Sequence, residues 1–166
     1  MATLIAIPIL VGLAIFQSTV VSRIPLLHGT ADLVLLVLVA WASQERVKTH
    51  WQWSIIGGLL VSILSAMPFG VLLIGYLMAT VMALVLRRRV WKVPILAMFT
   101  TVFLGTLLVH ALSMAALWLV GNPQPFLEAI DIITLPSLIL NLLLAIPMFI
   151  LISDLAKWLY PEEIEV

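Results

Sequence analysis

The segment Arg87-Arg88-Arg89-Val90-Trp91-Lys92 is the densest run of charge in the sequence, and it lies between two long apolar stretches. A Lys or Arg side chain at the centre of a bilayer costs about 2.5–3.5 kcal/mol, so four of them together must lie in water. Short basic loops stay in the cytoplasm. We therefore assign Arg87, Arg88, Arg89 and Lys92 to the membrane surface, where they orient the chain and contact anionic lipids.

The composition around this segment is that of an integral membrane protein. Of the 166 residues, 64% are apolar and only 10% are charged, and the mean hydropathy is +1.26. A soluble domain carries about 25% charged residues, which it needs to cover its surface. The chain has no cysteine, which excludes disulfides, thiolate catalysis, Cys-ligated metals and iron–sulfur clusters.

Apolar runs on both sides of the basic segment predict an all-α bundle of about six transmembrane helices, with residues 1–160 as one domain. The expected helices cover residues 4–21, 32–42, 51–66, 71–86, 94–120 and 126–160. Six crossings bring both termini to the cytoplasm, with 161–166 as an acidic cytoplasmic tail. All Lys and Arg residues except Arg23 then fall on the cytoplasmic side, as the positive-inside rule requires.

The second expected helix is too short to cross a bilayer, because about 20 residues are needed. Three explanations remain open for the apolar run 33–42. The charged side chains at its ends reach back to the interface, the bilayer thins, or the helix is buried against its neighbours. Thr30 is expected to cap this helix, with Asp32 in the first turn.

Small residues recur on two of the expected helices. Ser54, Gly58, Ser62 and Ala66 are spaced by four residues, and Gly75 and Ala79 repeat that spacing on the next helix. Such a face lets two helix backbones approach closely, either within one protein or against a partner's transmembrane helix. Asn141 has the same two interpretations, because an amide inside a membrane cross-links helices or binds a partner or ligand. Trp51 and Trp53 are expected at the membrane interface.

The polar candidates for chemistry are Asp32 and His110. His110 falls near the middle of an expected helix, where an ionisable group marks either a functional site or a hydrogen bond between helices. The three histidines lie on separate segments without metal-ligand spacing, and no catalytic or cofactor motif is present. No acidic residue is expected at mid-membrane, which argues against active transport. We expect no enzyme activity, no cofactor and no metal.

Several short motifs, taken in order, resemble the bacterial rod-shape-determining MreD family over nearly the whole chain. They are Gln17-Ser18-Thr19, Ala31-Asp32-Leu33-Val34-Leu35, Gly57-Gly58-Leu59-Leu60, Pro68-Phe69-Gly70, Gly75-Tyr76 and Leu135-Pro136-Ser137-Leu138-Ile139-Leu140-Asn141. The chain departs from the family pattern at Ala31, where Pro is usual, and at Ser62, where Asp is frequent.

The resemblance implies a non-enzymatic, multi-pass protein of the bacterial inner membrane that belongs to the cell-elongation machinery. Its implied partners are MreC and, directly or indirectly, the MreB filament and the RodA/penicillin-binding synthase pair. The implied fold is similar to the substrate-binding membrane subunits of energy-coupling-factor transporters.

A function of another class is a subunit that captures a vitamin-like small molecule for a membrane transporter. It would use an outward-opening cavity lined by His110, Asn141 or Trp118. A cavity with several convergent polar groups favours this alternative. An apolar groove along the small-residue stripe favours the interaction protein.

Overall fold

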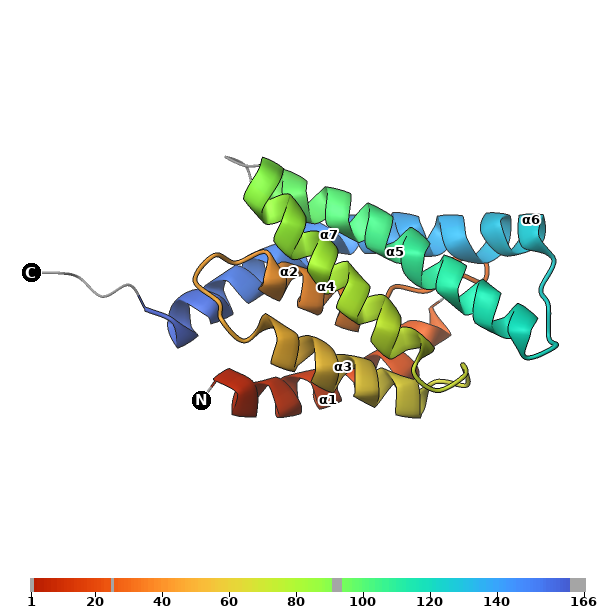
Figure 1. Ribbon diagram of the computed structural model, residues 1–166, viewed down its shortest axis with the longest axis horizontal. Helices are drawn as coiled ribbons and strands as arrows, with labels where there is room; N and C mark the ends of the chain where they lie inside the picture. The colour runs from red at the N-terminus through yellow and green to blue at the C-terminus, as the bar shows by residue number, and fades with distance from the viewer. Residues whose placement is uncertain (1, 25, 91–93, 162–166) are drawn as a thin grey trace, which may run out of the picture.

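The computed structural model describes residues 2–24, 26–90 and 94–161, which form helices joined by short connections (Figure 1). The long helices are α1 (Ala2–Thr19), α4 (Val71–Val90), α5 (Pro94–Leu119) and α7 (Leu135–Leu159). Shorter elements are η1 (Val21–Arg23), α2 (Leu33–Ala42), α3 (His50–Leu64), α6 (Phe126–Ala129) and η2 (Ile130–Thr134). The predicted all-helical class is confirmed for this part of the chain.

Four helical stretches are long and apolar enough to cross a membrane. They are Ala2–Arg23, Val71–Arg88, Pro94–Leu119 and Phe126–Leu159, the last of which runs through α6, η2 and α7. These four support a multi-pass membrane protein. The apolar helices α2 and α3 are shorter, so length and composition identify four spans and not the expected six.

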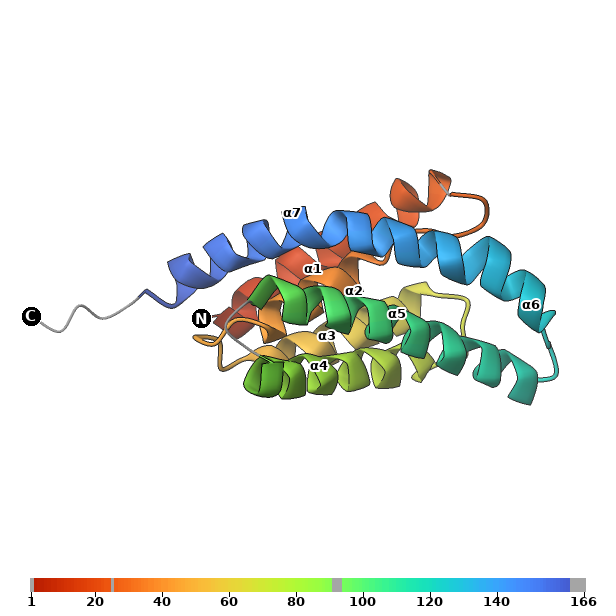
Figure 2. The ribbon, with the colours of Figure 1, turned by 90° about the horizontal axis from the view of Figure 1, so that it is seen from above.

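Helix α2 is the centre of the fold. Every residue from Leu33 to Ala42 is buried, and α2 contacts α1, α3, α4, α5 and α7. The surrounding helices enclose it in both views (Figures 1 and 2). Ten helical residues extend about 15 Å, roughly half of the apolar thickness of a bilayer. Of the three explanations for this short run, burial against neighbours is therefore the one observed.

At both ends of α2, side chains inside the bundle form hydrogen bonds with backbone groups. At the N-terminus, Asp32 and not Thr30 is the cap, and its carboxylate accepts a hydrogen bond from the Leu35 N–H at 3.0 Å. At the C-terminus, the Arg87 guanidinium donates to the carbonyls of Ala42 (3.1 Å) and Gln44 (2.6 Å). An anion at the start and a cation at the end both complement the helix dipole.

The small residues of α3 and α4 pack within the chain. Ser54, Gly58 and Ser62 are buried, and a Cβ added to Gly58 would lie 2.8 Å from the Leu73 Cα on α4. Ser54 also shares a hydrogen bond with Thr80 of α4. Helices α4 and α5 also approach closely, since a Cβ added to Gly75 of α4 would lie 3.0 Å from a Val109 methyl group of α5. Ala79 is buried as well, whereas Ala66 is exposed and lies after the end of α3.

Trp53 does not lie at an interface with lipid headgroups. Its side chain is fully buried and stacks on Trp41, with 4.1 Å between the ring centroids. The indole N–H donates to the Ala2 carbonyl at 3.2 Å. The prediction was wrong for Trp53 because stacking and a backbone partner satisfy the ring inside the bundle. Trp51 is 43% exposed.

The start of α1 and the end of α7 lie at the same end of the bundle (Figure 1). The α2–α3 connection, with Arg46 and Lys48, and the basic end of α4 lie there too. The basic run does not begin as a loop, because α4 continues through Val90. Lys92 and residues 162–166 of the expected tail lie outside the described residues.

Replacing Arg87 with Ala is expected to lower the free energy of unfolding by about 1–3 kcal/mol, because it leaves two carbonyls at a helix end without their charged donor. Arg88→Ala is the matched control, since Arg88 is exposed and its removal should change stability by less than about 0.5 kcal/mol. The measurement is reversible unfolding in mixed detergent micelles. Equal effects of the two substitutions would contradict the capping role of Arg87.

Candidate functional site

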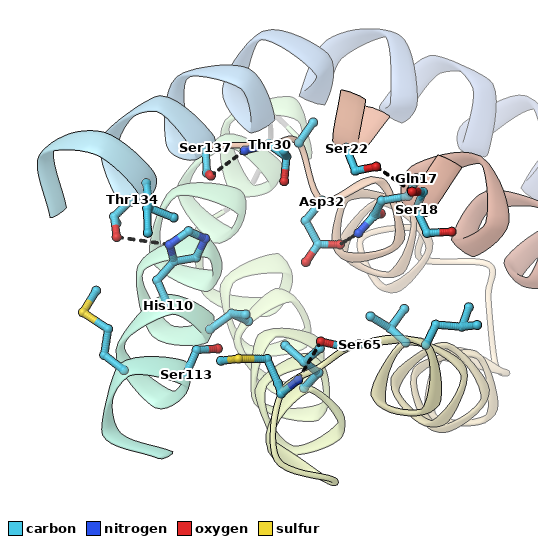
Figure 3. Close-up of a pocket in the computed structure, with 18 of the residues that line it drawn as sticks. Gln17, Ser18, Ser22, Thr30, Asp32, Ser65, His110, Ser113, Thr134 and Ser137 are labelled. Atoms are coloured by element: carbon cyan, nitrogen blue, oxygen red, sulfur yellow. Dashed lines mark hydrogen bonds between the residues drawn. The ribbon is translucent and has the colours of Figure 1, made fainter. Parts of the chain in front are cut away.

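A cavity of about 430 Å³ lies beyond the N-terminal end of α2, at the end of the bundle opposite the chain termini (Figure 3). It exists because α2 is short, whereas α1, α4, α5 and α7 continue past its first residue. Its polar lining residues are Gln17, Ser18, Ser22, Thr30, Asp32, Ser65, Tyr76, His110, Ser113, Gln124, Thr134 and Ser137. This is the convergent polar cavity that the sequence analysis associated with small-molecule capture.

The Asp32 carboxylate is the centre of a hydrogen-bond network on one side of this cavity. The Tyr76 hydroxyl of α4 lies 2.9 Å from Oδ1 and 2.7 Å from Oδ2 of Asp32. The Gln17 amide of α1 donates to Oδ1 at 3.4 Å, and its carbonyl oxygen accepts from the Val34 N–H at 3.1 Å. The carboxylate therefore joins α1 and α4 to the central helix.

Asn141 extends the network to α5 and α7. Its carbonyl oxygen accepts from the Asp32 N–H at 2.7 Å, and its amide donates to the Thr106 hydroxyl at 3.0 Å. Asn141 and Thr106 are both buried. Both ends of the amide thus serve helix contacts within the chain.

His110 and Thr134 form the opposite side of the cavity from Asp32 (Figure 3). The His110 Nδ1 lies 3.1 Å from the Thr134 hydroxyl. This contact joins α5 to the π-helical turn before α7. His110 is both a partner in a helix contact and part of the cavity wall.

A π-helical turn and a glycine shape the same side of the cavity. The turn η2 precedes Ser137, whose hydroxyl accepts a hydrogen bond from the Thr30 N–H at 3.0 Å. The His28 N–H donates to the Ile132 carbonyl at 3.0 Å. Gly29 is buried against this turn, and a Cβ there would lie 2.6 Å from both the Ile133 carbonyl oxygen and the Ser137 nitrogen. The segment that leads into α2 is therefore held directly on α7.

Asp32 is the only Asp, Glu, Lys or Arg among the described residues that line the cavity. The remaining polar groups are hydroxyls, amides and one imidazole, set among apolar side chains such as Val61, Leu72 and Leu117. Within the described ranges, no group of three or more His, Asp or Glu side chains could hold a metal ion. A cavity with this lining could accommodate a small molecule with polar groups.

The three residues that were expected to line a cavity, His110, Asn141 and Trp118, lie in different places. His110 lines the cavity, Asn141 lies beneath it in the network, and Trp118 is 69% exposed on the outside of α5. Tyr76, Gln17 and Thr134 were not among the site residues predicted from the sequence. Tyr76 and Gln17 belong to motifs of the MreD resemblance, which was the available signal for them. Nothing in the local sequence marks Thr134.

The Asp32 carboxylate bonds to the side chains of Gln17 and Tyr76 inside the bundle. Comparison with protein-family models, with curated proteins and with solved structures gives no match to this chain. The function is therefore inferred from the residues of the chain and from their geometry.

Proposed function

We propose that this protein is a non-enzymatic, multi-pass component of the bacterial cell-elongation machinery in the cytoplasmic membrane. It binds MreC and, directly or indirectly, MreB and the RodA/penicillin-binding synthase pair, and so supports peptidoglycan synthesis and cell shape. Both termini and the basic end of the bundle face the cytoplasm, as the positive-inside rule favours. Helices α2 and α3 complete six membrane-embedded helices.

The observation that carries this proposal is the convergence of the motifs behind the MreD resemblance. Gln17, Asp32, Tyr76 and Asn141 come from four motifs spread over more than a hundred positions of the sequence. Their side chains meet in one hydrogen-bonded network around the start of α2. Polar side chains within an apolar bundle must find partners, and here four of these partners come from motifs of the resemblance, which supports it.

Partner binding is proposed for the outer faces of the bundle and not for the small-residue stripe. Ser54 and Gly58 are covered by α4 of the same chain. The outward faces of α1 and α7 expose large apolar side chains, among them Ile15, Phe16, Leu143 and Leu151. In a membrane these faces meet either lipid or the apolar faces of partner helices.

Mild detergent extraction of the tagged chain from its own bacterium is expected to co-purify MreC. The control is an unrelated multi-pass membrane protein of similar size with the same tag and expression level. Depletion of the chain is expected to turn rod-shaped cells round, and re-expression to restore the rods. Absence of MreC enrichment together with unchanged cell shape would refute the proposal.

A second candidate, capture of a small molecule for a transporter, is favoured by the polar cavity itself. This function predicts that depletion abolishes uptake of a nutrient and leaves cell shape intact when that nutrient is supplied in excess. It also predicts co-purification with an ATPase instead of MreC. The same extraction therefore distinguishes the two functions.

A further inference from the structure

The charge of the cavity is unbalanced. Asp32 is the only formally charged side chain in the described lining, and its hydrogen-bond partners, Tyr76, Gln17 and the Leu35 N–H, are all neutral. Removing a carboxylate from water is costly unless a cation or several donors compensate. Neutral donors supply part of this compensation, and a cation would supply more.

The two carboxylate oxygens of Asp32 are not equally occupied. Oδ1 accepts from the Leu35 N–H and the Gln17 amide, and the one proton of the Tyr76 hydroxyl is shared between Oδ1 at 2.9 Å and Oδ2 at 2.7 Å. An ionised carboxylate has about four acceptor positions. Oδ2 therefore keeps room for one further donor, and the residue borders the hollow (Figure 3).

The rest of the cavity lining fits an organic molecule with few polar groups. Apolar side chains from several helices, including Val61, Leu72 and Met114, line the hollow. The Ser113 hydroxyl and the Gln124 amide also line the cavity, and they form no hydrogen bond with any described residue. A volume of about 430 Å³ falls in the range of small-molecule sites. An anion would meet the Asp32 carboxylate without a compensating Lys or Arg.

We propose that this cavity binds a small monovalent organic cation, an ammonium group on an apolar body, with the ammonium paired to the Asp32 carboxylate. This goes beyond the binding of partner proteins proposed above, and for the capture alternative it names the class of substrate. It does not depend on MreC, so its test and the extraction experiment fail independently.

The test is a series of three probes of nearly equal shape and different charge. They are 2-phenylethylammonium, 2-phenylethanol and phenylacetate, added to the purified full chain in dodecyl maltoside. Binding is read as the concentration-dependent rise of the unfolding midpoint. A charge-assisted hydrogen bond exceeds a neutral one by enough to make the ammonium probe about tenfold tighter than the alcohol. Phenylacetate is expected to bind most weakly.

Two variants assign the preference to this site. Asp32→Asn should bring the ammonium probe to within about threefold of the alcohol, while Asn still caps the helix and accepts from Tyr76. Ser113→Phe should occupy part of the cavity and weaken the response to all three probes. Ser153→Phe is its matched control, because it adds the same side chain on α7 outside the lining residues.

Equal binding of the ammonium and the alcohol by the wild-type chain would overturn the proposal, and so would tighter binding of phenylacetate or no response to any probe. Binding of the ammonium probe that is unweakened in Ser113→Phe would place the site elsewhere and also overturn the proposal. If Asp32→Asn fails to fold, the wild-type preference and the weaker binding in Ser113→Phe decide the question by themselves.

Discussion

Asp32→Ala is expected to lower the free energy of unfolding by about 3–5 kcal/mol, the largest loss among single side-chain truncations in this chain. The substitution removes the cap of α2, worth about 0.5–2 kcal/mol. It also leaves the buried Tyr76 hydroxyl and the half-buried Gln17 amide without their acceptor, and a buried donor without a partner costs about 1–3 kcal/mol. Because α2 contacts five other helices, its loosening affects the whole bundle.

The measurement is equilibrium unfolding in mixed micelles, with Asp32→Asn as the conservative comparison. Asn keeps an acceptor for the Leu35 N–H and for Tyr76, so its loss should be less than half of that of Ala. Tyr76→Phe should cost about 1–2 kcal/mol alone and little more when combined with Asp32→Ala, since one interaction is removed twice. Full additivity of the two substitutions would argue against the network.

Gly29→Ala is expected to destabilise the protein by about 3 kcal/mol and to open the junction between the 26–30 segment and α7. The added Cβ would lie 2.6 Å from the Ile133 carbonyl oxygen and 2.6 Å from the Ser137 nitrogen, both backbone atoms. Side chains can rotate away from an added methyl group, but a helix backbone moves only at the cost of its hydrogen bonds. Overpacking of this kind costs about 1–3 kcal/mol and occasionally more.

Gly12→Ala is the matched control, because a Cβ at Gly12 has no atom within 4 Å. Gly12 lies inside α1, where Ala is the better helix former by about 1 kcal/mol, so this variant should be equal to or more stable than the wild type. Hydrogen exchange of the Ser137 and Thr30 amides should rise in Gly29→Ala and stay unchanged in Gly12→Ala. Wild-type stability of Gly29→Ala would show that the loop does not pack this closely.

The helices could be predicted because their cause is local. Long apolar runs interrupted by Pro, Gly and charge are visible in the sequence, and the observed α4 and α5 begin where their apolar runs begin. The residues at which the helices end were less predictable. α4 continues through Arg87 to Val90, and the Arg87 side chain has partners in the carbonyls of Ala42, at the end of α2, and of Gln44. A residue assigned to the membrane surface by its charge alone thus also caps a buried helix.

The candidate site was predictable only in part, because its hydrogen bonds join residues that are far apart in the sequence. His110 and Asn141 stood out because a polar group within an apolar run must find a partner. The partners themselves, Thr134 for His110 and Thr106 for Asn141, are ordinary residues in the sequence. They become important only once α5 and α7 lie side by side.

The amino-acid sequence by itself determined the membrane class, the helical composition and the concentration of positive charge near one end, because each depends on composition and on neighbours along the chain. Only the tertiary structure decided that the shortest apolar helix is the buried centre and that its capping carboxylate borders a cavity. Hydrophobicity tells whether a helix avoids water but not whether lipid or protein surrounds it. That choice depends on which helices pack together.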